Sequence, residues 1–373
     1  MKWQGKEITE LWEYLQNTDR RVVLYGMGNG ADKIWDVCES RGIRVCEVFA
    51  SDGFVRGQMF RGQRVKSWSE VKSEYGVQNL TVLLSFATSL PDVLENIQRI
   101  AAETELFAPD VPVFGDTLFD GAFFEAHRSE FEEARAMLSD EESRRIFDLV
   151  IEYKLSGDIC PLLAARSDLD TVMKTLVHPE KLHTVADLGA YNGDTARELL
   201  AHGATPDRIY AMEPDARNFR KLSEYASNET RTEIIPVRAA AWSCEDTLIF
   251  DASGNRNASA GQNRSAALDG RPMKTVELPA MPLDAVLEGA CVDYIKYDVE
   301  GSEQEALTGS RASILAHYPT LMVSLYHRSE DLFVIPLRIR EEFPAYEGFY
   351  LRRFGGVPAW DLNFYVTKEK QDV

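Results

Sequence analysis

Residues 184–195 read Thr-Val-Ala-Asp-Leu-Gly-Ala-Tyr-Asn-Gly-Asp-Thr, and this stretch decides the fold. Its apolar start is typical of a buried strand, and the run after Gly193 is typical of a helix. A glycine turn between a strand and a helix lets a ligand lie against bare backbone N–H groups. The pattern therefore predicts an α/β fold that binds a nucleotide-like cofactor after its first strand.

A second short strand, at 209–212, ends in Glu213-Pro214-Asp215. Glu213 follows Gly193 by about 20 residues, where nucleotide folds place the carboxylate that binds a ribose diol. Glycine and aspartate also fill ordinary turns for backbone reasons. Because the strand, the turn and the acid all agree, we favour a site for a cofactor that contains adenosine.

The acids around the turn indicate which adenosine cofactor it is. NAD sites place the glycines of G-x-G-x-x-G under a pyrophosphate, whereas Asp187 and Asp194 bracket the glycines here. Carboxylates would repel a pyrophosphate but attract the sulfonium and amino groups of S-adenosylmethionine. We therefore expect S-adenosylmethionine rather than NAD.

Composition bounds the class of protein. The 373 residues are enough for two domains, at about 150 residues each. A net charge of -19 disfavours nucleic acid and anionic membranes as partners. Five scattered cysteines fit reduced thiols, and neither a signal peptide nor an apolar run of the ~18 residues that span a membrane is visible. We expect a cytoplasmic protein that binds neither nucleic acid nor membranes.

Strands that alternate with helices predict two Rossmann-like α/β lobes in series, each with a parallel sheet. We assign 1–117 to a small nucleotide-binding-type domain, 118–164 to a charged helical connector and 165–373 to the cofactor domain. The expected strands are 21–25, 43–49, 80–86 and 111–114 in the first lobe, and 185–188, 209–212, 234–237, 294–297 and 321–325 in the second. Aromatic alternation over 348–367 predicts a closing antiparallel hairpin, and the polar run 252–270 predicts a mobile loop, which we interpret as a lid.

A second cluster of polar residues follows the strand at 294–297. Asp298 and Glu300 come directly after it, and Gly301 permits a sharp turn into the next helix. The carboxyl ends of strands are where ligands bind in open α/β sheets. Two carboxylates there can hold a proton, a metal or a cationic cofactor, or simply cap the following helix.

His327 ends the next expected strand, so we expect it at the same edge as Asp298 and Glu300. Histidine is a natural general base near neutral pH and suits the deprotonation of a hydroxyl. The same three residues are also a possible ligand set for a divalent metal that lowers the pKa of a hydroxyl. A hydrogen-bonded histidine at the edge of the sheet is the plain structural alternative.

Four parts of the sequence resemble the FkbM family of S-adenosylmethionine-dependent methyltransferases: the run 187–194, the triplet 213–215, the segment Ile-Lys-Tyr-Asp-Val-Glu-Gly at 295–301, and the strand that ends at His327. The similarity covers roughly 165–367, and the Lys-x-Asp-x-Glu-Gly run is its most specific part. It implies a seven-stranded methyltransferase fold. It also implies O-methylation of a hydroxyl on a small-molecule or glycan acceptor, such as a sugar or a polyketide-type metabolite.

The resemblance further implies which residues form the cofactor site. They are Asp187, Gly189, Ala190, Tyr191, Gly193, Asp194, Glu213, Pro214, Asp215, Asn218, Ala240, Ala241, Trp242 and Asp298. The first turn would line the methionine end of the cofactor, Glu213 would hold the ribose, and Trp242 with the two alanines would border the adenine. The resemblance does not settle the catalytic base, and we assign catalysis to Asp298, Glu300 and His327 from their places after the strands.

The N-terminal lobe carries a weaker motif, Gly26-x-Gly28-x-x-Ala31, with Asp52 near the usual ribose position. It resembles the small Rossmann-like domains of sugar-modifying enzymes. Such a lobe either binds a nucleotide or nucleotide-sugar or is purely structural. Two alternatives to a methyltransferase remain open: an NAD(P)-dependent oxidoreductase that uses this glycine loop, and a nonenzymatic binding protein that retains the cofactor fold.

Overall fold

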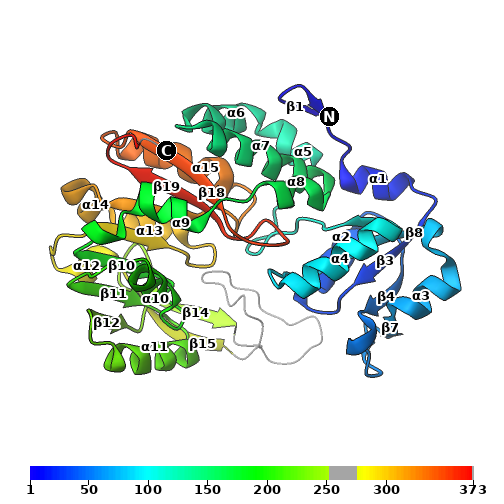
Figure 1. Cartoon of the computed structure of the whole chain (residues 1–373), viewed down its shortest axis with the longest axis horizontal. Coiled ribbons are helices and arrows are strands. Elements are labelled where there is room, and N and C mark those ends of the chain that lie inside the picture. The colour runs from blue at the N-terminus through cyan, green and yellow to red at the C-terminus, as the bar shows by residue number, and fades with distance from the viewer. Residues whose placement is uncertain (252–274, 372–373) are drawn as a thin grey trace.

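The computed structural model describes residues 1–251 and 275–371. The loop expected over 252–270 lies outside the described residues. Figure 1 shows two lobes, each built around its own sheet, with the helices of the expected connector between them. This arrangement confirms the predicted fold class, two Rossmann-like α/β lobes in series.

The C-terminal lobe contains a seven-stranded sheet in the order β12-β11-β10-β16-β17-β19-β18. Its strands are β10 (Thr184–Leu188), β11 (Arg208–Met212), β12 (Glu233–Val237), β16 (Tyr294–Tyr297), β17 (Thr320–Ser324), β18 (Gly348–Arg353) and β19 (Leu362–Thr367). The first five are parallel to their neighbours, and β19 pairs antiparallel with both β17 and β18. The expected closing hairpin is therefore confirmed.

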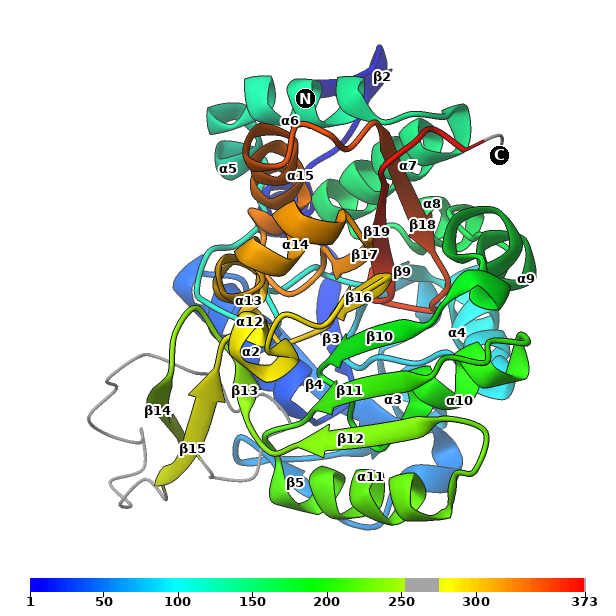
Figure 2. The same cartoon turned by 90° about the vertical axis from the view of Figure 1, so that its left-hand side faces the viewer.

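Alternation along the strands packs this sheet on both faces. On β10, Val185 packs into one buried cluster with residues of α10 and α11, whereas Ala186 and Leu188 pack into the other with residues of α13, α14 and α15. Figure 2 shows α9 and α10 on one side of the sheet and α13 and α14 on the other. The polar residues of the site follow the ends of these buried strands.

The helices of this lobe are α9 (Leu169–Val172), η3 (Met173–Val177), η4 (Pro179–Lys181), α10 (Asp194–Ala201), α11 (Ala216–Asn228), α12 (Leu283–Leu287), α13 (Glu303–Gly309), α14 (Arg311–His317) and α15 (Asp331–Glu342). A small second sheet joins β13 (Ala240–Ala241), β15 (Thr275–Met281) and β14 (Asp246–Asp251) in that order.

The N-terminal lobe contains a five-stranded parallel sheet in the order β7-β4-β3-β8-β9. The elements of this half are β1 (Lys2–Trp3), β2 (Lys6–Glu7), α1 (Leu11–Asn17), β3 (Arg21–Tyr25), α2 (Asn29–Ser40), β4 (Val45–Ala50), η1 (Asp52–Phe54), β5 (Met59–Phe60), β6 (Gln63–Arg64), β7 (Lys66–Ser67), α3 (Trp68–Tyr75), η2 (Val77–Asn79), β8 (Leu80–Leu84), α4 (Pro91–Glu103) and β9 (Glu105–Phe107).

The strand expected over 111–114 is wrong. The last strand of the N-terminal sheet is β9, and 111–114 instead runs across to the C-terminal lobe. The backbone N–H of Phe114 donates to the carbonyl oxygen of His327 at 2.8 Å. The apolar run was therefore a sign of contact between the lobes rather than of a strand.

The expected connector consists of α5 (Gly121–Ala126), α6 (Arg128–Met137), α7 (Glu141–Ser156) and α8 (Ile159–Ala164). It covers the edge strand β18: the hydroxyls of Ser139 and Ser143 accept the N–H groups of Phe349 and Leu351, each at 2.9 Å. An edge strand covered in this way cannot pair with another chain.

All five cysteines are free thiols. Among the helices that the structure describes, none is long and apolar enough to cross a membrane.

Candidate cofactor and acceptor site

Parallel strands bring their carboxyl ends to one edge of the sheet, and a buried ammonium group connects two of them. The Nζ of Lys296 on β16 lies 3.3 Å from Asp187 Oδ1 on β10 and 3.6 Å from Asp298 Oδ2. It also donates to the carbonyl oxygen of Gly189 at 3.3 Å. Burial lowers the pKa of Lys296, but the charges of Asp187 and Asp298 outweigh burial and the pKa is raised. The ammonium therefore stays charged between the two acids.

Gly189 cannot be a larger residue, because the turn after β10 packs directly against the backbone of Asp298, which follows β16. Its φ is +86°, and a Cβ built there would lie 1.9 Å from the carbonyl oxygen of Asp298. Gly193 has a different reason: its φ is +88°, and a Cβ would lie 2.5 Å from the ring of Tyr225 on α11. The first glycine thus shapes the cofactor edge, and the second lets α10 pack against α11.

Glu213 is buried at the end of β11 and accepts two backbone N–H groups. Its Oε2 accepts from Tyr191 at 2.9 Å, and its Oε1 accepts from Asp215 at 2.8 Å. Burial raises the pKa of Glu213 to about 7, although these hydrogen bonds oppose the rise. The carboxylate is held rigidly and still has acceptor capacity on both oxygens.

These groups fit an adenosine cofactor with a cationic end. Within the described part of the chain, the buried Oδ2 of Asp187 has no hydrogen-bond partner. Burial raises the pKa of Asp187, since Lys296 offsets only part of the desolvation. An amino group or sulfonium brought beside Asp187 would satisfy this orphaned oxygen, and ribose hydroxyls would satisfy Glu213.

The other residues expected at the cofactor surround these two acids. Ala190 is buried, Tyr191 is 45% exposed with a φ of 46°, and Asp194 is the first residue of α10. After Glu213, Pro214 is half-buried, and Asp215 caps α11 by accepting the N–H groups of Arg217 and Asn218, each at 2.9 Å. Ala240 and Ala241 form β13, shortly after β12, and Trp242 packs against the small second sheet.

The acceptor side is centred on Asp298. Its Oδ1 accepts the hydroxyls of Ser324 at 3.0 Å and Tyr326 at 2.9 Å. Burial alone raises the pKa of Asp298, but the charges of Lys296 and His327 outweigh it and the pKa falls below its usual value. Asp298 is therefore an oriented, ionised carboxylate.

The structure brings His327 to Asp298 and Glu300, as the sequence predicts. The Nε2 of His327 lies 3.6 Å from Asp298 Oδ1 and 3.7 Å from Glu300 Oε2. Strand alternation does not bring the two acids together, because β16 ends at Tyr297 and both acids lie in the turn that follows. The buried carboxylate of Glu303 shapes this turn by accepting the N–H groups of Val299 at 3.0 Å and Gly301 at 3.4 Å.

The environment of His327 argues against its predicted role as the base. The ring is fully buried, and its Nδ1 lies 2.8 Å from Glu303 Oε1. Burial lowers the pKa of His327, but the carboxylates of Glu303, Asp298 and Glu300 outweigh it and raise the pKa to about 10. At neutral pH the imidazole already carries its second proton, so it has no lone pair to accept another.

Glu300 is better placed to accept a proton. Its side chain is 58% exposed, and its backbone adopts a φ of 54°. Burial and the neighbouring charge of Asp298 raise the pKa of Glu300, although His327 opposes the rise. A carboxylate of raised pKa at an open surface is a stronger base than an ordinary one.

The structure gives no support to the metal alternative. Within 1–251 and 275–371, no three side chains of His, Cys, Asp or Glu are arranged to hold a metal ion.

The glycine loop of the N-terminal lobe begins α2 as expected, but its ribose-type acid is engaged elsewhere. Asp52 accepts the N–H of Ser69 at 3.1 Å and its hydroxyl at 2.5 Å. Lys33 on α2 donates to the carbonyl oxygens of Pro112 and Val113. A nucleotide ligand of this lobe stays a prediction.

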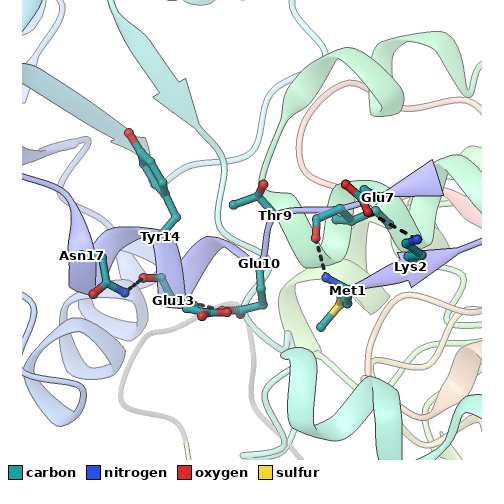
Figure 3. A pocket seen from close by; sticks show the side chains of 9 residues that line it. Met1, Lys2, Glu7, Thr9, Glu10, Glu13, Tyr14 and Asn17 are labelled. Carbon is teal, nitrogen blue, oxygen red and sulfur yellow. Dashed lines mark hydrogen bonds and ion pairs between the residues drawn. The ribbon is translucent and has the colours of Figure 1, made fainter.

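A separate pocket of about 570 Å³ lies between the β1–β2 hairpin and α1. Figure 3 shows that Lys2 and Glu7 pair with each other there, and that the Met1 amino group bonds within the hairpin. Glu10 caps α1 by accepting the N–H of Glu13. These groups stabilise the start of the chain, and none of them lies on a strand end of the cofactor edge.

Sequence reasoning missed several polar residues of the site. Lys296 was visible as the one cation in a buried strand, and Glu303 as an acid on the first turn of α13. Tyr326 adjoins His327 in sequence. Trp360 and Asp361 gave no signal, because only the antiparallel return of β19 brings their loop to this edge.

Comparisons with known proteins agree with this geometry. The profile of the methyltransferase FkbM domain matches residues 187–351. The methyltransferase FkbM from Methylobacillus flagellatus KT has a similar fold: the TM-score is 0.68 at 20% identity, over 94% of this chain and 90% of that one. No curated protein sequence matches.

Two other solved structures match about half of the chain. The fibrillarin of Aeropyrum pernix, with bound S-adenosyl-L-methionine, has a TM-score of 0.32 at 13% identity over 50% of this chain and 66% of that one. Precorrin-6y C5,15-methyltransferase from Geobacter metallireducens GS-15 has a TM-score of 0.31 at 11% identity over 54% and 87%.

Gly189→Ala is expected to weaken cofactor binding strongly, because the new methyl group would displace either the first turn or the Asp298 carbonyl. We expect the affinity for S-adenosylhomocysteine, measured by calorimetry, to fall by about 100-fold. Gly203→Ala is the matched control: its φ is +89°, but a Cβ there meets nothing within 4 Å. That variant bears the same backbone strain of about 1–2 kcal/mol and keeps its affinity. Equal losses in both variants would contradict the steric argument.

Cofactor affinity is expected to rise with pH through about 7, as Glu213 ionises. The protonated carboxyl is a poorer acceptor for ribose hydroxyls than the carboxylate, so binding at pH 6 should be up to about tenfold weaker than at pH 8. Calorimetry with S-adenosylhomocysteine across this range measures the slope. In Glu213→Gln we expect weaker binding without the slope, and an unchanged slope in that variant would assign it to another group.

Proposed function

Residues 187–351 are an FkbM-family methyltransferase domain, and on that premise we propose that the protein methylates a hydroxyl oxygen of a sugar, glycan or polyketide-type acceptor. The cofactor is S-adenosylmethionine, which supplies a methyl group activated by a sulfonium. The observation that carries the proposal is the pairing of a cofactor cradle, Asp187 and Glu213, with a second group of acids at the same sheet edge.

The residues at this edge divide the work. Asp187 and Gly189 receive the methionine end of the cofactor, and Glu213 receives the ribose. Asp298 is oriented by Ser324 and Tyr326, so it accepts a hydrogen bond from the incoming hydroxyl and fixes its direction. Holding the oxygen in line with the methyl group supplies the larger part of the rate.

The hydroxyl must lose its proton as the new C–O bond forms. We assign the proton to the Glu300 carboxylate, whose pKa is raised and whose side chain is exposed. His327 acts as a positioning residue in this scheme, because the same nitrogen of its imidazolium, Nε2, lies 3.6 Å from Asp298 and 3.7 Å from Glu300. The electron pair of the breaking C–S bond stays on sulfur, and the products are a methyl ether and S-adenosylhomocysteine.

We also propose that the chain is organised in three parts, with the helical connector 118–164 joining the lobes 1–117 and 165–373. The free thiols fit the cytoplasmic location expected from the sequence. An oxidoreductase that uses the N-terminal glycine loop is disfavoured, since Asp52 and Lys33 are both engaged within the protein.

Calorimetry with S-adenosylhomocysteine and, separately, NADH tests the function. We expect micromolar binding of the first ligand, its loss in Glu213→Ala, and no binding of NADH, because Glu213 is the buried acceptor for the ribose. Glu198→Ala is a suitable control because that acid lies on α10, beyond the turn. Tight NADH binding without S-adenosylhomocysteine binding would overturn the proposal.

Glu300→Gln is expected to lower methyl transfer by about 100-fold or more, because glutamine cannot accept the proton. The assay follows labelled methyl transfer from S-adenosylmethionine into a small-molecule extract of the source cells. Glu305→Gln, on α13, is the control and should keep the wild-type rate. Both variants should bind S-adenosylhomocysteine normally, and an unchanged rate in Glu300→Gln would move the proton to another group.

A further inference from the structure

The loop between β18 and β19, residues 354–361, lies at the cofactor edge of the sheet. β19 runs antiparallel to β17, and Asn363 near its start pairs with Ser324 at the end of β17. Ser324 itself donates to Asp298. The loop therefore leads into the strand beside the acceptor side of the site, although it is far from Asp298 in sequence.

Residues of both lobes bond to this loop. Within the C-terminal lobe, the buried guanidinium of Arg353 donates to the carbonyl oxygens of Gly356 and Pro358. From the N-terminal lobe, Thr88 exchanges two backbone hydrogen bonds with Val357, of 2.8 and 3.0 Å. Gly356 is needed for this approach, because a Cβ there would lie 1.9 Å from the Thr88 carbonyl oxygen.

The loop 354–361 carries an exposed aromatic residue, Trp360, and an exposed acid, Asp361. Trp360 is 41% exposed and stacks on Tyr326 with ring centroids 6.4 Å apart and planes 28° apart. Asp361 has a φ of 55° and is exposed. Partial desolvation of this carboxylate and the negative charge of Asp298 raise the pKa of Asp361.

The buried imidazole of His327 lies against two acids at the same edge of the sheet. The Nε2 of His327 is fully buried and, among the described residues, has no hydrogen-bond partner. It faces Asp298 and Glu300 at 3.6 and 3.7 Å, distances that leave its N–H unsatisfied. An unsatisfied buried donor is costly, and a ligand oxygen that reached Nε2 past the exposed side chain of Glu300 would remove the cost.

We propose that Trp360, Tyr326, Glu300 and Asp361 form the acceptor subsite, and that it takes an uncharged ring bearing several hydroxyls. This rests on the proposed function and narrows it. Trp360 receives the apolar C–H face of the ring, the two carboxylates accept its hydroxyl protons, and one ring oxygen lies near His327.

Charge excludes a phosphorylated or carboxylated ring. Three carboxylates surround the subsite, and the nearby cations are engaged: Lys296 with Asp187, and Arg328 with the carbonyl of Gly301 and the ring of Phe114. An anionic group would be repelled by these carboxylates. Among the described residues, the imidazolium of His327 is the cation beside them, and Glu303, Asp298 and Glu300 already surround it. The N-terminal lobe acts here through Thr88, which positions the loop that carries Trp360.

Saturation-transfer NMR in the presence of S-adenosylhomocysteine tests the subsite with methyl β-glucopyranoside and glucose 6-phosphate. We expect ring-proton signals from the neutral glycoside and much weaker ones from the phosphate. Trp360→Ala should weaken glycoside binding about tenfold, whereas Trp360→Phe keeps most of it. Phe54→Ala removes a 64% exposed aromatic of the N-terminal lobe and should change nothing.

Thr88→Pro and Thr88→Ala form a second, backbone-specific pair. Proline removes the N–H that Val357 accepts, so it should weaken glycoside binding and speed amide exchange over 354–361, whereas alanine keeps that bond. Stronger binding of the phosphate, equal signals from wild type and Trp360→Ala, or no signal from the neutral glycoside would overturn the subsite. Calorimetry distinguishes failure of the proposed function from failure of the subsite. If the wild-type protein does not bind S-adenosylhomocysteine, the proposed function is wrong. If it binds S-adenosylhomocysteine but not the glycoside, only the subsite is wrong.

Discussion

The ammonium group of Lys296 is the interaction on which this site depends. It is buried between Asp187, which lies on β10, and Asp298, which follows β16, and it also donates to the Gly189 carbonyl. Removal of one partner from a buried ion pair costs about 3–5 kcal/mol, because a charge is left without compensation. The cofactor turn and the acceptor-side acid are thus tied to one cation. If the cofactor turn or the loop that carries Asp298 moved, Lys296 would lose one of its two carboxylate partners.

The acids of the acceptor side need a second cation, and His327 supplies it. Glu303, Asp298 and Glu300 surround its ring, and Asp331 lies close enough for its pKa to be raised by burial and by Glu303. The positive charge of the imidazolium offsets the mutual repulsion of these carboxylates. A sulfonium nearby would compete for the same acids and lower the pKa of His327. The charge balance of the site therefore changes with the cofactor bound.

Sequence reasoning predicted the fold and the strand-end acids because both follow from local rules. The alternation of buried strands and helices fixed the two sheets, and the ends of parallel strands brought Asp187, Glu213, Asp298 and His327 to one edge. It failed where the result depends on tertiary contact. The apolar run 111–114 reads as a strand, but it contacts His327, and the pKa of His327 follows from Glu303, whose role appears only in three dimensions.

The position of the loop 354–361 also depends on tertiary contacts that local sequence rules do not predict. At this loop the two lobes are hydrogen-bonded to each other. The carboxyl end of β8 leads to Thr88, and the loop before β19 contains Val357, so the carboxyl edges of the two parallel sheets face each other at this loop. Thr88 and Val357 belong to no sequence motif, because the hydrogen bonds between them join backbone atoms alone. This contact adds two hydrogen bonds between the lobes to the support that the loop already receives from Arg353 and from the stacking of Trp360 on Tyr326. The N-terminal lobe therefore helps to position the loop that carries the proposed acceptor subsite.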